Sequence, residues 1–181
     1  DLLGALKEAL PQLQEKSVVA ITSKVVSIWQ GRCVPISEAS EKDELIISES
    51  DKYLPRDFVP NRWVMHTIKH NLFVPSAGID ESNAKGYYVL WPDKLREAVK
   101  ELYDWVREAY GLRDVGIVIT DSHTIPLRRG TMGISLAHYG FQPLKDYRDT
   151  PDLFGRPFKI SQLNIADGLA ATAVLAMGEG N

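Results

Sequence analysis

The sequence has little cysteine and no long apolar run. Its 181 residues contain a single cysteine, Cys33. One thiol forms neither an internal disulfide nor a thiolate metal cage, so the chain is not a disulfide-stabilised secreted domain and fits a reducing compartment. Apolar runs such as residues 115–119 are far shorter than the roughly 20 residues of a membrane-spanning helix. We therefore expect a cytoplasmic protein with no membrane partner.

An excess of charge of one sign is also missing. Lys and Arg total 21 and Asp and Glu total 24, which gives a formal net charge of −3. Nucleic-acid binding needs a dense basic surface, so we expect no nucleic-acid partner. A hydrophobic share of 44% and a charged share of 25% are typical of a globular chain that buries a core.

No internal repeat, low-complexity tract or linker divides the sequence. We therefore expect a single domain over residues 1–181. The chain begins with Asp1 inside an amphipathic pattern and closes on a loop-like stretch at residues 178–181. We expect both ends to be cut, with parts of the native protein beyond them.

Common nucleotide-binding and hydrolase motifs are absent. The sequence contains no Walker A loop and no G-x-G-x-x-G, H-E-x-x-H or G-x-S-x-G stretch. Each of these motifs places glycines, metal ligands or a nucleophile at a spacing that its chemistry requires. A nucleotide that binds this chain is therefore held differently than in P-loop or Rossmann proteins.

Hydrophobic periodicity defines most of the expected secondary structure. Apolar residues at helical spacing predict helices over residues 2–10, 41–53, 95–109 and 166–177. Apolar stretches predict strands over residues 17–22, 115–120 and 134–139, and a hairpin over 64–75. The continuous run at 115–120 predicts a central strand that ends in Asp121 and Ser122, and such strand ends often open a site.

Three carboxylates lie at loop or strand ends. Asp80 follows a glycine-containing turn, Asp121 follows the predicted central strand, and Glu179 lies between two glycines. Magnesium and manganese prefer carboxylate oxygen and often take one or two protein carboxylates while phosphates complete the shell. The spacing leaves open a metal site and the commoner roles of such residues as turn caps and solvated side chains.

Other candidates also allow two interpretations. Arg128 and Arg129 precede a glycine and suit the capture of a phosphate or carboxylate, although a surface ion pair explains them equally well. His66 and His70 would share a metal on a helix, but on the predicted strand they lie roughly 13 Å apart, which favours solvent-facing histidines. For Cys33, an inert half-buried thiol is favoured because no base lies nearby in sequence.

Five motifs appear in the order typical of one family. The sequence contains A-G-I-D-E-S-N at 77–83, G-I-V-I-T-D-S at 116–122, R-R-G at 128–130, D-L-F-G-R-P at 152–157 and M-G-E-G at 177–180. Together they resemble the coenzyme F420 gamma-glutamyl ligases over nearly the whole chain. The resemblance implies an α+β fold of mixed sheets with flanking helices, of the gamma-glutamyl ligase type and neither P-loop nor Rossmann.

The family resemblance also implies a reaction. Such a ligase joins L-glutamate to the carboxylate of coenzyme F420-0 through an acyl phosphate, with GTP as co-substrate. It uses two Mg²⁺ or Mn²⁺ ions, often with K⁺, and acts as a homodimer. The implied partners are therefore small molecules: GTP, L-glutamate and a deazaflavin acceptor.

Matching the motifs position by position implies roles for individual residues. Asp80 and Asp121 would hold a first divalent ion, and Ser122 and Glu179 a second. Arg128 or Arg129 would stabilise phosphate or the acceptor carboxylate during catalysis. The residues implied to contact the nucleotide are Ser23, Lys24, Asn83, Met177, Gly178, Glu179 and Gly180.

Two positions depart from the family pattern. Ile28 stands where the family has a nucleotide-contacting lysine, and His123 follows Ser122 where the family continues towards Gly-Arg. Such changes are similar to those of a divergent branch described as folate-metabolism gamma-glutamate ligases. A folate-like pterin or another small carboxylate as acceptor, and a non-catalytic nucleotide- or cofactor-binding relative, therefore stay open as alternatives.

Overall fold

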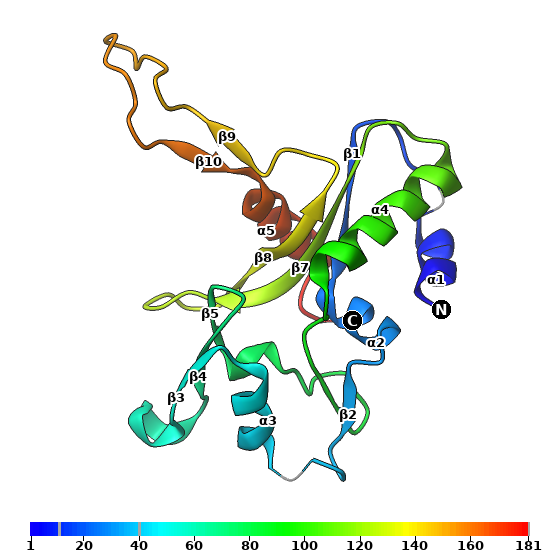
Figure 1. The fold of residues 1–181 in the computed structure, drawn as a ribbon, viewed down its shortest axis with the longest axis vertical. Helices are drawn as coiled ribbons and strands as arrows, with labels where there is room; N and C mark the ends of the chain where they lie inside the picture. Colours follow the sequence, from blue (N-terminus) through cyan, green and yellow to red (C-terminus); the bar gives the residue numbers. More distant parts are fainter. Residues whose placement is uncertain (11, 40, 181) are drawn as a thin grey trace. The chain divides into compact units, whose positions relative to one another are not determined.

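Helices accompany several small mixed or antiparallel sheets, which gives the expected α+β fold (Figure 1). The computed structural model describes residues 1–10, 12–39 and 41–180. These form two compact units: unit 1 comprises residues 1–2, 23–94 and 123–131, and unit 2 comprises residues 3–22, 95–122 and 132–180. Whether the chain folds as a single domain over 1–181 stays a prediction. No helix in the described ranges is long and apolar enough to cross a membrane.

Unit 2 contains a sheet in which the predicted central strand is indeed central. Its strands β1 (Ser17–Thr22), β7 (Val115–Thr124) and β8 (Thr131–Tyr139) lie in the order β1-β7-β8. The strands β1 and β7 are parallel and pair from Ser17↔Val115 to Thr22↔Thr120. Residues 115–120 are all buried, which explains why the run is continuously apolar rather than alternating.

In the part of the chain that the structure describes, three helices belong wholly or mainly to unit 2. The first, α1 (Leu2–Ala9), is short, whereas α4 (Leu95–Tyr110) is long and buries the stripe Ala98, Val99, Leu102 and Val106, as its periodicity predicts. The helix α5 (Ile165–Met177) is capped by Asn164, whose side chain accepts from the Asp167 N–H at 3.0 Å. It packs closely on β8, because a Cβ on Gly133 would lie 2.3 Å from the Ala170 carbonyl oxygen.

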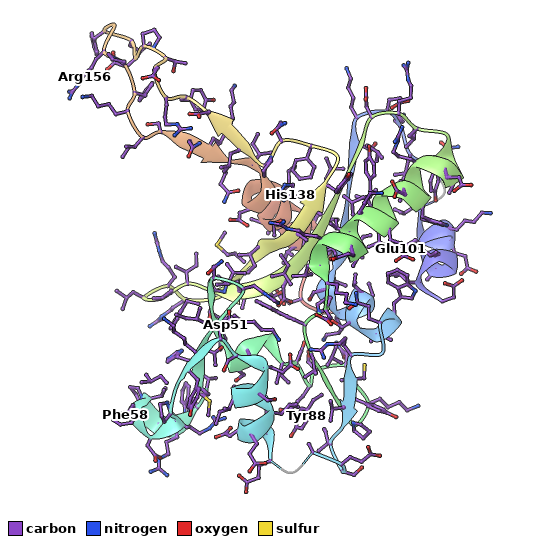
Figure 2. All side chains as sticks on the ribbon, viewed as in Figure 1. Asp51, Phe58, Tyr88, Glu101, His138 and Arg156 are labelled. Atoms are coloured by element: carbon purple, nitrogen blue, oxygen red, sulfur yellow. The ribbon has the colours of Figure 1, made fainter. Side chains whose placement is uncertain are left out.

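An arm extends from the rest of unit 2 (Figure 1). The strands β9 (Leu144–Asp146) and β10 (Gln162–Asn164) pair antiparallel at its base. The D-L-F-G-R-P motif forms its outer turn, where the Asp152 carboxylate accepts from the N–H groups of Phe154 at 2.8 Å and Arg156 at 2.9 Å. Figure 2 shows Arg156 at the end of this arm.

The described residues of unit 1 form two further helices, two small sheets and three 3₁₀ turns. Its elements are α2 (Ser23–Trp29), β2 (Cys33–Pro35), α3 (Lys42–Glu49), β3 (Lys52–Leu54), η1 (Arg56–Phe58), η2 (Pro60–Arg62), β4 (His66–Lys69), β5 (Leu72–Pro75), η3 (Ser76–Gly78) and β6 (Tyr87–Val89). The sheets are β3-β4-β5 and β2-β6, both antiparallel. One hydrophobic cluster of its core comprises Ile46, Met65, Ala77, Ile79, Tyr88 and Leu90.

Two predictions in unit 1 have different outcomes. The hairpin over 64–75 is confirmed, with β4 and β5 joined through His70 and Asn71, both at positive φ. The helix predicted over 41–53 ends at Glu49, and residues 52–54 form β3 instead. The reason is tertiary, because β3 pairs with β4 from Lys52↔Ile68 to Leu54↔His66, and local periodicity does not record that partner.

A charged cluster stabilises the interior of unit 1. The Glu49 carboxylate accepts from Lys69 Nζ at 2.6 Å and from Arg32 Nη2 at 2.7 Å. The Lys69 side chain is only 6% exposed, and its ammonium lies 5.9 Å from the centre of the Trp91 ring. Burial opposes ionisation of Glu49, but the hydrogen bonds and charges of Lys69 and Arg32 outweigh it and lower the pKa of the carboxyl.

Glu49→Gln is expected to lower the free energy of unfolding at neutral pH by about 1–2 kcal/mol. A carboxyl whose folded-state pKa is lowered stabilises the protein above its unfolded pKa, and this stability is lost as the pH falls through the folded value. As the pH falls below 4.5, the usual pKa of glutamate, the unfolding free energy of the wild type should therefore decrease more steeply than that of the variant. Urea unfolding across this pH range measures the difference.

A suitable control is Asp146→Asn, which removes the exposed Asp146–Arg148 pair of the arm. Exposed pairs are screened by solvent, so its stability should stay close to wild type. Equal pH profiles for wild type and Glu49→Gln would contradict the stabilising role of the cluster.

Candidate functional site

The A-G-I-D stretch of unit 1 is anchored on both sides of its turn. The Ala77 N–H donates to Thr67 Oγ1 at 2.9 Å, and that hydroxyl donates to the Val74 carbonyl at 2.5 Å. Asp80 exchanges two backbone hydrogen bonds with Val89, at 3.0 and 2.8 Å. These bonds hold the backbone at Asp80, and the carboxylate itself is about half exposed.

Gly78 of this stretch lies against an aromatic ring. Its φ is +73°, and a Cβ placed on it would lie 2.2 Å from the Trp91 indole. The left-handed backbone favours glycine, and the close approach of the ring leaves no room for a side chain. Gly78 therefore fixes the path of the turn that leads to Asp80.

The Asp80 carboxylate contacts a serine two residues on. The Ser82 N–H donates to Asp80 Oδ1 at 2.7 Å, and the Ser82 hydroxyl donates to Oδ2 at 3.0 Å. Lys24 Nζ, from the first turn of α2, lies 2.6 Å from Oδ2. Burial opposes ionisation of Asp80, but Lys24 and Ser82 outweigh it, so the pKa of this carboxyl lies below its usual value.

A second group of oxygen atoms lies in unit 2. Ser122 is in β7, directly after Asp121, and its hydroxyl donates to Glu179 Oε1 at 2.8 Å and approaches Oε2 at 3.0 Å. Glu179 follows α5, which ends at Met177, and Gly178 takes a positive φ of 76° between them. The structure thus brings together the two residues for which the resemblance implies one metal ion.

The remaining predicted residues are distributed as follows. Ser23, which is buried, begins α2, and Asn83 follows the Asp80–Ser82 turn at a positive φ. Arg128 and Arg129 lie in the loop between β7 and β8. Of the four residues implied to bind metal, Asp80 belongs to unit 1, and Asp121, Ser122 and Glu179 belong to unit 2.

The donor atoms of both groups suit a hard divalent cation. Carboxylate, hydroxyl and carbonyl oxygens are the ligands that Mg²⁺ and Mn²⁺ prefer. Within either unit, the described residues contain no group of three or more His, Cys, Asp or Glu side chains able to hold an ion. Mg²⁺ commonly uses one or two protein carboxylates, with substrate phosphates completing its shell.

The sequence patterns do not single out Ser82 as a site residue, although its contacts organise the Asp80 group. Its amide and hydroxyl bind both oxygens of Asp80, and its carbonyl and hydroxyl accept from Lys24. The signal that would have found it is the Asp-x-Ser spacing, because an aspartate often accepts from the N–H two residues on.

The histidines and the cysteine have other surroundings. Cys33 is half-buried, as predicted. His70 is exposed, whereas His66 is half-buried rather than solvent-facing because its ring stacks on Phe73 at a centroid distance of 5.3 Å.

Comparison with known proteins identifies the family. The sequence model of the F420-0:gamma-glutamyl ligases matches residues 1–181. A coenzyme F420:L-glutamate ligase of Methanopyrus kandleri is 31% identical over 196 residues, which cover 99% of this chain and 76% of the relative. A coenzyme F420:L-glutamate ligase of Methanocaldococcus jannaschii is 30% identical over 193 residues, which cover 96% of this chain and 76% of the relative. The chain therefore belongs to the F420-0:gamma-glutamyl ligase family.

Proposed function

We propose that the protein is a ligase that forms an amide bond between the amine of L-glutamate and the carboxylate of coenzyme F420-0, with GTP as co-substrate. Family membership carries this proposal. The two oxygen-rich groups, at Asp80 and at Glu179, support it because both lie in motifs of the family resemblance. We further propose that it acts as a homodimer and uses K⁺ in addition to the divalent ions.

A carboxylate does not react with an amine unless it is activated. Transfer of the GTP γ-phosphoryl group to the acceptor carboxylate forms a mixed anhydride, an acyl phosphate, and releases GDP. The glutamate amine then attacks the acyl carbon, loses a proton and displaces inorganic phosphate. This sequence divides one unfavourable step into two accessible ones.

The residues of the chain have separate tasks in this proposal. Asp80, Asp121, Ser122 and Glu179 would hold divalent ions, which supply positive charge to the triphosphate and to the transferring phosphoryl group. Lys24 and Asn83 bind the nucleotide. Arg128 or Arg129 binds phosphate or the acceptor carboxylate through paired N–H groups.

The identity of the acceptor has a second candidate, a folate-like pterin. The departures at Ile28 and His123 together support it, because such changes are similar to those of the branch described as folate-metabolism gamma-glutamate ligases. Deazaflavins and pterins absorb and fluoresce differently. The spectrum of any chromophore that purifies with the protein therefore distinguishes the two acceptors.

Calorimetric titration with GTP and with ATP, each with and without Mn²⁺, tests the nucleotide and metal requirements. We expect GTP to bind in the presence of Mn²⁺ and binding to be lost when the metal is removed. Equal GTP binding with and without Mn²⁺ would contradict the metal role. No binding of either nucleotide would favour a relative that has kept the fold without the reaction.

A further inference from the structure

The ammonium group of Lys24 lies among three oxygens of the Asp80 turn. Its Nζ is 2.6 Å from Asp80 Oδ2, 2.7 Å from the Ser82 carbonyl oxygen and 3.0 Å from the Ser82 hydroxyl. A carboxylate, a carbonyl and a hydroxyl are together the donor types that hard metal cations use in proteins. The side chain of Lys24 thus contacts the atoms to which a divalent ion at Asp80 would bind.

The turn holds these oxygens in place independently of Lys24. The Ser82 N–H is bonded to Asp80 Oδ1, and the Ser82 hydroxyl is bonded to Oδ2. The backbone at Asp80 is fixed by its two hydrogen bonds to Val89. Removing the lysine head group is therefore expected to leave an oxygen-lined position rather than a collapsed loop.

Lys24 and a divalent ion cannot both contact Asp80 Oδ2 without strong repulsion between their positive charges. The Lys24 side chain is 24% exposed, so solvent screens this repulsion only partly. A nucleotide phosphate offers the ammonium another anionic partner, in charge-assisted hydrogen bonds of comparable strength.

We infer that Lys24 is an internal cation that occupies the Asp80 carboxylate until a nucleotide phosphate withdraws it, so that divalent ions bind at Asp80 readily only together with the nucleotide. This inference rests on the proposed function, which supplies the nucleotide and the metal. It adds an order to binding. Without nucleotide, Lys24 weakens the binding of metal at Asp80. Once metal is present, Lys24 strengthens the binding of the nucleotide. The two affinities are therefore coupled through one side chain.

Lys24→Met tests the inference, because methionine keeps an unbranched side chain and removes the charge. Mn²⁺ affinity without nucleotide should rise by about three- to tenfold, which corresponds to the contribution of a partly exposed ion pair with charge-assisted hydrogen bonds. The electron paramagnetic resonance signal of free Mn²⁺ measures this affinity. GTP affinity at saturating Mn²⁺ should fall by a similar factor. Opposite changes in the two affinities are the expected signature.

Lys42→Met is the matched control. Lys42 forms an ion pair with Glu81 in the same turn, so this variant makes the same change in charge close to Asp80 without freeing its carboxylate. We expect both affinities to stay within about twofold of wild type, the range of an exposed pair. An equal rise in Mn²⁺ affinity in both variants would show that the change in net charge alone causes the effect, and it would overturn the inference.

The other outcomes separate the inference from the proposed function. If Lys24→Met weakens the binding of both Mn²⁺ and GTP, Lys24 supports the structure of the loop and the inference is overturned. If wild type binds GTP with Mn²⁺ but Lys24→Met leaves nucleotide-free Mn²⁺ affinity unchanged, the inference fails and the proposed function stands. If wild type binds no GTP with Mn²⁺, the proposed function fails and the inference fails with it.

Discussion

Asp121→Asn is expected to lower glutamate-dependent phosphate release by about a hundredfold or more, since even the outer partners of metal ligands are commonly worth 10–100-fold. Asparagine keeps the shape of the side chain and one neutral oxygen but loses the charge that binds Mg²⁺ or Mn²⁺. Asp121 is only half-buried, beyond the buried stretch 115–120 of β7, and asparagine is close to it in size, so the substitution should leave the fold intact. Steady-state turnover and thermal unfolding of the same preparation measure both effects.

Asp104→Asn provides the control for this prediction. It makes the same chemical change in unit 2, in an exposed ion pair with Lys100 one turn away on α4. We expect its turnover to match wild type. Wild-type turnover in Asp121→Asn would remove Asp121 from the catalytic machinery, and a loss of turnover accompanied by unfolding would give it a structural role.

Gly78→Ala is expected to cost about 2–5 kcal/mol of unfolding free energy, from a left-handed backbone that disfavours alanine and from overpacking against a buried ring. The added methyl would lie 2.2 Å from the Trp91 indole, which is itself only 2% exposed. Because Gly78 leads to Asp80, nucleotide-dependent Mn²⁺ binding should weaken in any folded fraction. Urea unfolding and Mn²⁺ titration measure the two effects.

Gly31→Ala isolates the packing contribution. Gly31 has almost the same φ, +71° against +73°, but apart from its chain neighbours no atom of the described residues lies within 4 Å of the Cβ position. It should therefore lose only the conformational part, about 1–2 kcal/mol. Equal destabilisation of the two variants would show that the contact with Trp91 contributes nothing.

The sequence predicts well those elements whose burial pattern is local. The periodicity of α4 predicts its core-facing stripe, and the continuous apolar run of β7 corresponds to a strand buried on both faces. The hairpin of β4 and β5 turns through His70 and Asn71 at positive φ, and asparagine tolerates this conformation better than most residues.

Elements that depend on remote partners could not be predicted in the same way. The helix α2 contains Val25, Val26 and Ile28, which favour strands by propensity. The strand β3 is exposed at all three positions and exists because its backbone pairs with β4. In the arm, β9 and β10 pair across the intervening residues 147–161, and the turn depends on hydrogen bonds of Asp152.

The candidate site shows the same division. Recognisable motifs predict Asp80, Asp121 and Glu179 as site residues, and the structure adds the contacts of Asp80 and Glu179. The contact between Lys24 and Asp80 joins residues 56 positions apart in sequence, so no local pattern contains it. The role of Ser82 depends on backbone atoms, which sequence letters do not describe.

The formation of one amide bond tests the central claim most directly. The protein is incubated with coenzyme F420-0, L-glutamate, GTP and Mn²⁺, and the product is identified by mass spectrometry while released phosphate is counted. We predict a glutamylated coenzyme, with one phosphate released per amide bond and no product when glutamate, GTP or metal is omitted. GTP binding without any glutamylated coenzyme F420 would contradict the proposed acceptor, and a glutamylated pterin in a parallel reaction would identify the other one.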